Sequence, residues 1–188
     1  MKLLRSAVIP LVLACLALTG CSSLSGTGDK GYISGEGVPV EVAAADRDAP
    51  LELSGEDLDG KPVDLADLRG KPVVINVWWS ECPPCRVEQP DLNEAAAELG
   101  DKVSFLGLNI RDSSAEKGLA FTRNFDVAYP SIYSPDGSAL LSFAGTLNPR
   151  SIPSTVVLDS QGRVAASVQG RIPTTQTLLS LVDVVLGE

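Results

Sequence analysis

Two cysteines separated by two prolines are the residues of this chain best placed to do chemistry. Cys82 and Cys85 follow an almost wholly apolar run at 73–79 and stand at the start of a stretch with helical periodicity. Two thiols at this spacing, held where a strand turns into a helix, can close and reopen a disulfide. On a mobile loop, the same spacing would more often indicate half of a metal site. The cysteine and histidine content decides between these two interpretations.

The composition excludes several kinds of site. The 188 residues include four cysteines and no histidine. Without an imidazole, the chain cannot form a Cys/His zinc site, a haem site with a proximal His, or a Ser–His or Cys–His catalytic pair. Cys15 and Cys21 lie in a segment with another predicted fate, and two sulfurs alone cannot close a structural zinc site. We therefore expect no metal, and no cofactor other than the redox-active disulfide Cys82–Cys85.

Cys82 is predicted to be the attacking nucleophile, because a thiol attacks a disulfide only as the thiolate. The first turn of a helix stabilises negative charge, and Pro83 suits the first helical position. Arg86 adds a positive charge one turn further on. Cys85 is expected to lie toward the core, less accessible than Cys82, and to resolve the mixed disulfide. A purely structural disulfide is the alternative, although so small a loop constrains little of an unfolded chain.

The N-terminus resembles the signal of a bacterial lipoprotein. Lys2 and Arg5 precede an uncharged apolar stretch at 7–18, which is too short to span a bilayer. The stretch ends in Leu-Thr-Gly-Cys, similar to a lipobox, in which the cysteine (here Cys21) receives a diacylglyceryl group. This predicts a signal peptide at 1–20 and lipid anchoring at the outer face of the cell membrane, where disulfides can persist. An ordinary secretory signal with an incidental Cys21 is the alternative.

Removal of the signal would leave a strongly acidic protein. Lys2 and Arg5 leave with it, so 15 positive side chains become 13 against 24 negative ones, a charge of −11. Such a chain repels phosphate backbones and anionic lipid surfaces. We therefore expect no nucleic-acid partner, and membrane contact through the lipid only.

The rest of the chain divides into a tether and one domain. Residues 21–49 are rich in Ser, Gly, Ala and charge, which predicts a flexible tether; a short strand at 38–42 is the alternative for its end. Residues 50–188 suffice for a single core, and strands that alternate with helices predict a layered α/β domain with a mixed sheet. The patterns predict strands at 51–54, 73–79, 103–110, 131–133, 155–158 and 164–168, an Asp-Gly hairpin turn at 58–63, helices at 83–99, 115–125 and 174–186, and a brief helix or turn at 140–143.

The residues around the two cysteines resemble those of a known family. The pattern Asn-x-Trp-x-x-x-Cys-x-x-Cys-Arg-x-Glu-x-Pro at 76–90 is similar to the signature of the TlpA/ResA group of membrane-tethered thiol–disulfide oxidoreductases. Ser-Ile-Pro-Ser-Thr at 151–155 resembles the loop that carries the cis-proline of the thioredoxin fold. The resemblance covers residues 50–188. It implies a thioredoxin-like α/β fold, with a mixed central sheet flanked by helices, an N-terminal β-hairpin and an inserted segment at 103–134.

The resemblance also implies roles for individual residues. Pro153 would have a cis bond after Ile152, whose backbone would pair with the substrate chain as an added strand; a simple strand-entry proline is the alternative. Glu88 would tune the cysteine pKa values and handle protons, since Asn76 stands where thioredoxin has a buried acid; a solvated helix carboxylate is the alternative. The catalytic residues are then Cys82, Cys85 and Glu88, and the substrate-binding residues are Trp78, Glu81, Pro83, Pro84, Ile152 and Pro153, with Trp78 forming a packing wall beneath the site.

One residue departs from the family pattern. The family has Trp directly before the first cysteine, whereas this chain has Glu81. A carboxylate beside Cys82 disfavours the thiolate and raises its pKa. We therefore expect Glu81 either to weaken the nucleophile or to select a basic partner.

The predicted function is reduction of disulfides in exported proteins by a monomeric, lipid-anchored protein. The resemblance implies apocytochrome c as the substrate, whose CxxCH thiols must be free before haem attaches, and a membrane thiol transporter as the reductant. Three alternatives remain: a disulfide oxidant, a thiol peroxidase, and a ligand-binding or adhesive lipoprotein with an inert disulfide. The reduction potential separates the first alternative from reduction. The Pro-x-x-x-Thr-x-x-Cys motif usual in peroxidases is missing before both Cys82 and Cys85.

Overall fold

A six-stranded mixed sheet forms the centre of the domain. The computed structural model describes residues 37–188. The strand order is β1-β8-β7-β4-β5-β6, with β4, β5 and β6 parallel and the other pairs antiparallel. The strands of this sheet are β1 Pro39–Glu41, β4 Val73–Trp78, β5 Ser104–Ile110, β6 Ser131–Ser134, β7 Ser154–Leu158 and β8 Val164–Gln169. A separate hairpin pairs β2 (Ser54–Glu56) with β3 (Pro62–Asp64).

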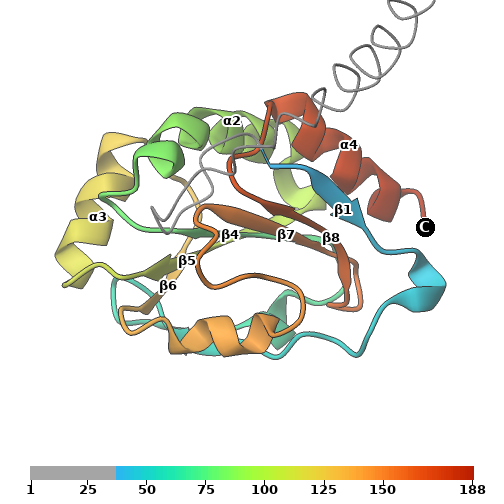
Figure 1. Ribbon diagram of the computed structural model, residues 1–188, viewed down its shortest axis with the longest axis horizontal. Coiled ribbons are helices and arrows are strands. Elements are labelled where there is room, and N and C mark those ends of the chain that lie inside the picture. The colour runs from blue at the N-terminus through green and yellow to red at the C-terminus, as the bar shows by residue number, and fades with distance from the viewer. Residues whose placement is uncertain (1–36) are drawn as a thin grey trace, which may run out of the picture. The chain divides into compact units, whose positions relative to one another are not determined.

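Helices and short segments cover both faces of the sheet (Figure 1). The three α-helices are α2 Pro83–Leu99, α3 Ala115–Asn124 and α4 Thr175–Leu186. One buried cluster joins one face of the sheet to α2 and α4, through residues such as Leu92 and Val182. The other cluster joins the opposite face to the hairpin, to α3 and to a 3₁₀ segment at Ser138–Phe143, and it contains both Cys82 and Cys85. This arrangement is the predicted thioredoxin-like α/β fold.

Most predicted elements are confirmed with small shifts at their ends. Helix α2 begins at Pro83 and ends at Leu99, as the N1 proline and the following Gly100 indicate. The strand predicted at 51–54 is wrong in position, because residues 51–53 are irregular and β2 begins at Ser54. Within the described residues, no helix is long and apolar enough to cross a membrane. The predicted signal, Cys21 and the first part of the tether lie outside these residues.

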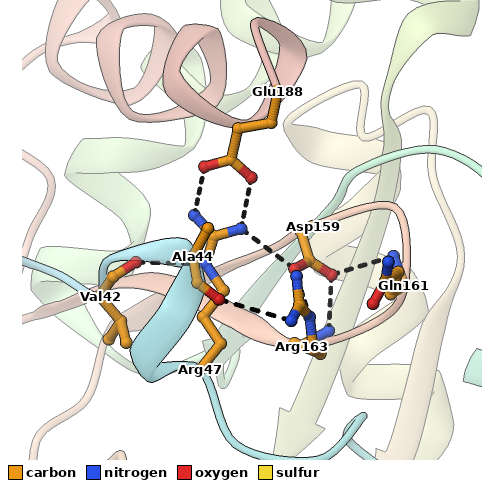
Figure 2. A network of polar contacts seen from close by, with 7 residues as sticks. All are labelled: Val42, Ala44, Arg47, Asp159, Gln161, Arg163 and Glu188. Atoms are coloured by element: carbon orange, nitrogen blue, oxygen red, sulfur yellow. Dashed lines mark hydrogen bonds and ion pairs between the residues drawn. The ribbon is translucent and has the colours of Figure 1, made fainter.

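The end of the predicted tether belongs to the folded domain. The alternative of a short strand at 38–42 is confirmed, since β1 pairs with β8 along the sheet edge. Just after β1, the side chain of Arg47 is only 1% exposed and donates to Asp159 Oδ2 at 3.1 Å and to Glu188 Oε1 at 2.6 Å (Figure 2). Asp159 also accepts from Arg163 Nε at 2.8 Å. The prediction of a flexible tether through residue 49 is therefore wrong for 39–49, because long-range pairing orders this segment.

Replacement of Arg47 with Met is expected to destabilise the domain by about 3–5 kcal/mol at pH 7, because it leaves the buried carboxylate of Asp159 without one of its partners. Burial alone would raise the pKa of Asp159, but hydrogen bonds from the backbone of Arg163 and from Arg47 outweigh it and lower that pKa. The hydrogen bond from Arg47 lowers the pKa of Glu188.

A carboxyl group with a lowered folded-state pKa stabilises the protein above its unfolded pKa and loses this effect as the pH falls through the folded value. The difference between wild type and Arg47→Met should therefore shrink below about pH 4. Urea unfolding at pH 7 and pH 3 measures this. Arg69→Met is the control, because Arg69 pairs with the exposed Glu52 and should cost less than about 1 kcal/mol. Equal losses in both variants would contradict the prediction.

Candidate active site

The two cysteines lie at the junction of β4 and α2, as predicted. Strand β4 ends at Trp78, a short turn follows, and Cys82 is the N-cap of α2 with Pro83 at the first helical position. Cys82 and Cys85 form a disulfide, with their Cα atoms 5.3 Å apart. The backbone N–H of Cys85 donates to Cys82 Sγ at 3.2 Å. A donor directed at this sulfur from the helix terminus is what would stabilise a Cys82 thiolate.

The predicted difference in exposure between the two cysteines is not present in the disulfide form. Cys82 is 2% exposed and Cys85 is 1% exposed. The side chains beside them are open: Glu81 and Pro83 are exposed and Pro84 is partly buried. The position of Cys82 at the helix N-cap therefore distinguishes the two sulfurs better than accessibility does.

Arg86 keeps a positive charge close to this turn. Its Nη1 donates to the carbonyl of Ser80 at 3.1 Å, and its guanidinium lies 5.0 Å from the centre of the Phe125 ring. Cation–π contact and a backbone acceptor hold the charge one turn after Cys82. That Arg86 favours the thiolate stays a prediction.

The loop before β7 contains the predicted cis-proline. The bond between Ile152 and Pro153 is cis, and β7 begins at the next residue. Ile152 is 6% exposed and belongs to the same buried cluster as Trp78, Cys82 and Cys85. Among residues 37–188, neither the backbone N–H nor the C=O of Ile152 has a hydrogen-bond partner. A free backbone donor and acceptor in the same buried cluster as the disulfide is an arrangement that can pair with an added peptide strand.

Glu88 is a buried carboxyl group rather than a solvated one. It is fully buried; Asn76 Nδ2 donates to Oε1 at 2.9 Å, and the backbone N–H of Ile172 donates to Oε2 at 2.9 Å. Burial raises the pKa of Glu88 to about 8, although both hydrogen bonds act in the opposite direction. Asn76 Nδ2 also donates to Thr155 Oγ1 at 3.1 Å. Glu88 therefore lies one turn past Cys85 as a buried carboxyl group that is mostly protonated at neutral pH.

Trp78 forms a wall beneath the site. Its side chain is buried, its ring centre is 4.4 Å from that of Phe121, and its Nε1 donates to Ser131 Oγ at 3.3 Å. Gly107 makes this placement possible, because a Cβ atom there would overlap both Trp78 and Ser131. The prediction that Trp78 is a packing residue agrees with these contacts.

Glu81 does not present an unopposed charge. Its carboxylate accepts from Lys117 Nζ at 2.7 Å, and both side chains are about half exposed, at 60% and 47%. This pairing raises the pKa of Lys117. The idea that Glu81 selects a basic partner is weakened, since a cation of the same chain already pairs with it.

Replacing Lys117 with Met should raise the pKa of the Cys82 thiol, because the charge of Glu81 is then unopposed; Glu81→Gln should lower it. The interaction within an exposed ion pair is weak, so we expect the fraction of Cys82 present as thiolate to change by less than about fivefold. The pH dependence of iodoacetamide alkylation, in the reduced protein carrying Cys85→Ser, measures it. Lys61→Met serves as the control, since Lys61 faces Asp59 on the hairpin. Superimposable curves for all variants would refute the effect.

Sequence reasoning missed a polar group that supports the turn before Cys82. Asp112 is 1% exposed and accepts from the backbone N–H of Ser80 at 3.0 Å, from Ser80 Oγ at 2.6 Å and from Asn109 Nδ2 at 2.7 Å. Asn109 lies at the carboxyl end of the buried parallel strand β5 and Asp112 follows it, in the region where sites gather in α/β proteins. The position of Asp112 just after this strand was the sequence signal that could have identified it as a site residue. Within residues 37–188, no group of three potential metal ligands occurs.

Comparison with known proteins gives one family match and several similar proteins. The family model described as Redoxin matches residues 41–185. The thiol-disulfide oxidoreductase ResA of Bacillus cereus is 30% identical over 116 residues, which cover 61% of this chain and 64% of that protein. The thiol:disulfide interchange protein DsbE of Pseudomonas aeruginosa is 35% identical over 105 residues, 56% of this chain and 54% of that protein.

A solved structure resembles almost the whole described domain. The secreted thiol-disulfide isomerase of Corynebacterium glutamicum has a TM-score of 0.75 and 29% identity, and the match covers 90% of this chain and 99% of that one. The family match, the similar oxidoreductases and the disulfide at the helix N-terminus agree. The chain belongs to the Redoxin family and is a ResA-like thiol–disulfide oxidoreductase of the thioredoxin superfamily.

Proposed function

We propose that this protein reduces disulfides in exported proteins. One observation carries the proposal: the disulfide at a helix N-terminus lies in the same cluster as Ile152, whose backbone donor and acceptor are free among the described residues. A substrate segment that pairs with Ile152 as an added strand would bring its own disulfide to Cys82.

The proposed reaction transfers one electron pair in two exchanges. The Cys82 thiolate attacks one sulfur of the substrate disulfide, so a mixed disulfide forms and the other substrate sulfur leaves as a thiolate. The Cys85 thiolate then attacks Cys82 Sγ, which re-forms the Cys82–Cys85 disulfide and releases the second substrate thiolate. Overall, the two protons that Cys82 and Cys85 release when they form their thiolates end on the two substrate thiols. Glu88, with its pKa of about 8, is mostly protonated near neutral pH, so it would take up the proton that Cys85 loses only after giving its own proton away.

The substrate, reductant and location are further parts of the proposal. Apocytochrome c with its CxxCH thiols is the proposed substrate, and a membrane thiol transporter the proposed reductant, on the strength of the resemblance to the TlpA/ResA group. A signal peptide at 1–20 and lipid on Cys21 would place the monomer at the outer face of the cell membrane. Support for an extracytoplasmic location comes from the similar protein of Corynebacterium glutamicum, which is described as secreted.

A trapping experiment tests the substrate. Cells expressing the Cys85→Ser variant should accumulate mixed disulfides through Cys82, because the resolving thiol is missing. We expect cytochrome c precursors among the trapped proteins, identified by mass spectrometry after non-reducing isolation. The double variant Cys82→Ser/Cys85→Ser is the control and should trap none of them. Trapped exported proteins without any cytochrome precursor would refute the substrate assignment; the absence of any trapped protein would refute the reductase itself.

A further inference from the structure

The loop after β5 contacts both halves of the active site. Its first contact is the carboxylate of Asp112, which accepts two hydrogen bonds from Ser80, two residues before Cys82. A buried carboxylate is unfavourable unless it is well hydrogen-bonded. Asn109 supplies the third donor, and its own Oδ1 is left buried without a partner among the described residues. Asn109 thus uses its amide donor to hold Asp112, although its own acceptor has no partner among the described residues.

The second contact reaches the opposite side of the site. Arg111 Nη2 donates to the carbonyl of Pro149 at 3.1 Å, four residues before Pro153. The segment between them is internally bonded: Ser151 N donates to Asn148 O, and Ser154 Oγ donates to Ser151 O. A displacement of Pro149 would therefore be transmitted to Ile152.

The backbone between the two contacts has an unusual conformation. Arg111 has a φ of 64°, in the left-handed region that residues other than glycine seldom occupy. Such a conformation persists only where surrounding contacts hold it. Here the N–H of Arg111 donates to Pro135 O at 3.2 Å and Tyr133 OH donates to Asp112 O at 3.0 Å. Two adjacent residues thus reach two different segments of the site from one fixed turn.

We propose that Arg111 and Asp112 are positioning residues that set the placement of Cys82 relative to the substrate-pairing backbone of Ile152. This inference rests on the proposed function, because it assumes that the substrate is a polypeptide paired with Ile152. Reacting atoms must be held about 3–3.5 Å apart and correctly oriented, and a misplacement of about 1 Å can lower a rate about a hundredfold. A polypeptide bound by Ile152 depends on this distance, whereas a small disulfide that reaches Cys82 unaided depends on it much less.

The test compares two substrates in two sets of variants. The rates of reduction of a disulfide-bonded CxxCH peptide and of the small disulfide 5,5′-dithiobis(2-nitrobenzoate) are measured for each reduced protein. Arg111→Gly removes the guanidinium and suits the positive φ. It should lower kcat/KM for the peptide by about tenfold or more and lower the peptide-to-small-disulfide ratio by at least about fivefold. Arg111→Lys, which keeps a donor, should recover part of that ratio.

Asp112 is expected to behave differently, because it supports the turn that carries Cys82 itself. Asp112→Ala should lower both rates together, and Asp112→Asn, which keeps one acceptor for Ser80, should lower them less. Thermal unfolding shows which variants are folded. If Asp112→Ala does not fold, the comparison is made with Asp112→Asn alone. Arg150→Ala, in the loop that Arg111 contacts, is the control for the loss of a positive charge near that loop.

The possible results separate the inference from the function on which it rests. A lowered ratio in Arg111→Gly, with the ratio of Arg150→Ala at the wild-type value, supports positioning. Equal proportional losses for both substrates in Arg111→Gly, or a ratio shared with Arg150→Ala, overturn the role of Arg111. Wild-type rates in folded Asp112 variants overturn the role of Asp112. A wild-type protein that reduces neither disulfide would instead refute the proposed function.

Discussion

Replacement of Cys82 with serine should reduce disulfide exchange to the uncatalysed background, whereas replacement of Cys85 should leave the first exchange intact. The reason is the different position of the two sulfurs: Cys82 is the N-cap of α2 and accepts the Cys85 N–H, while Cys85 lies within the helix. A hydroxyl group cannot take the place of a thiolate in this reaction. Cys85→Ser should form a mixed disulfide with one equivalent of substrate and then stop.

Stopped-flow reaction with a peptide disulfide, followed by intact-mass spectrometry, measures both effects. Cys82→Ser should show no adduct, and Cys85→Ser should gain one peptide mass, located at residue 82 by digestion. The exposures of the two sulfurs, 2% and 1%, do not distinguish them, so this is a demanding test of the assignment. An adduct on Cys85 in the Cys82→Ser variant, formed at a comparable rate, would reverse the two roles.

Glu88→Gln should lower the rate of exchange at pH 7 by about a hundredfold, a typical loss when a proton-transfer group is removed. Burial raises the pKa of Glu88 to about 8, so the wild-type rate should change with pH near that value. Glutamine keeps the size and one acceptor but cannot exchange a proton. The variant should therefore lose this part of the pH profile. Glu98→Gln, an exposed position on the same helix, is the matched control.

The free energy of unfolding should also depend differently on pH in the wild type and in Glu88→Gln. In the unfolded chain Glu88 loses its proton near its ordinary pKa of 4.5, whereas in the folded protein it keeps the proton up to about pH 8. The unfolded state then binds fewer protons between these values, so wild-type stability falls as the pH rises through this window. The fall amounts to roughly 5 kcal/mol at 1.4 kcal/mol per pKa unit. Urea unfolding from pH 4 to pH 9 should show it in wild type only; parallel curves for Glu88→Gln would contradict the buried, protonated carboxyl.

Local sequence signals were sufficient to predict a helix or strand when residues at its two ends mark where it begins and ends. Helix α2 is predicted to the residue, because a proline at its first position and Gly100 after its end mark both termini. Strand β4 is recognisable because five of its six residues are apolar, as expected for a strand covered on both faces, and all six are buried. The cis bond before Pro153 came from the family resemblance and not from any local pattern.

Long-range contacts explain what the sequence did not predict. Strand β1 has three residues and forms only because β8, more than 120 residues later, offers an edge. Asp112 meets Ser80 across 32 residues of sequence, and its position after the carboxyl end of β5 does not by itself indicate that partner. The burial of Glu88 depends on Asn76 and Ile172, which come from a strand and a distant loop. Each of these features requires the assembled sheet.

The most direct test of this account is an equilibrium titration of the Cys82–Cys85 disulfide against dithiothreitol under native conditions. The fluorescence of Trp78 and Trp79, which precede the cysteines, can report the change of state. We predict a fully reversible two-electron transition, with a midpoint near −270 mV, as in thioredoxin, if the protein serves as a reductant. A midpoint near −120 mV would instead indicate an oxidant. A disulfide that stays closed in excess dithiol while the protein remains folded would contradict the central claim that these two sulfurs exchange electrons with a partner.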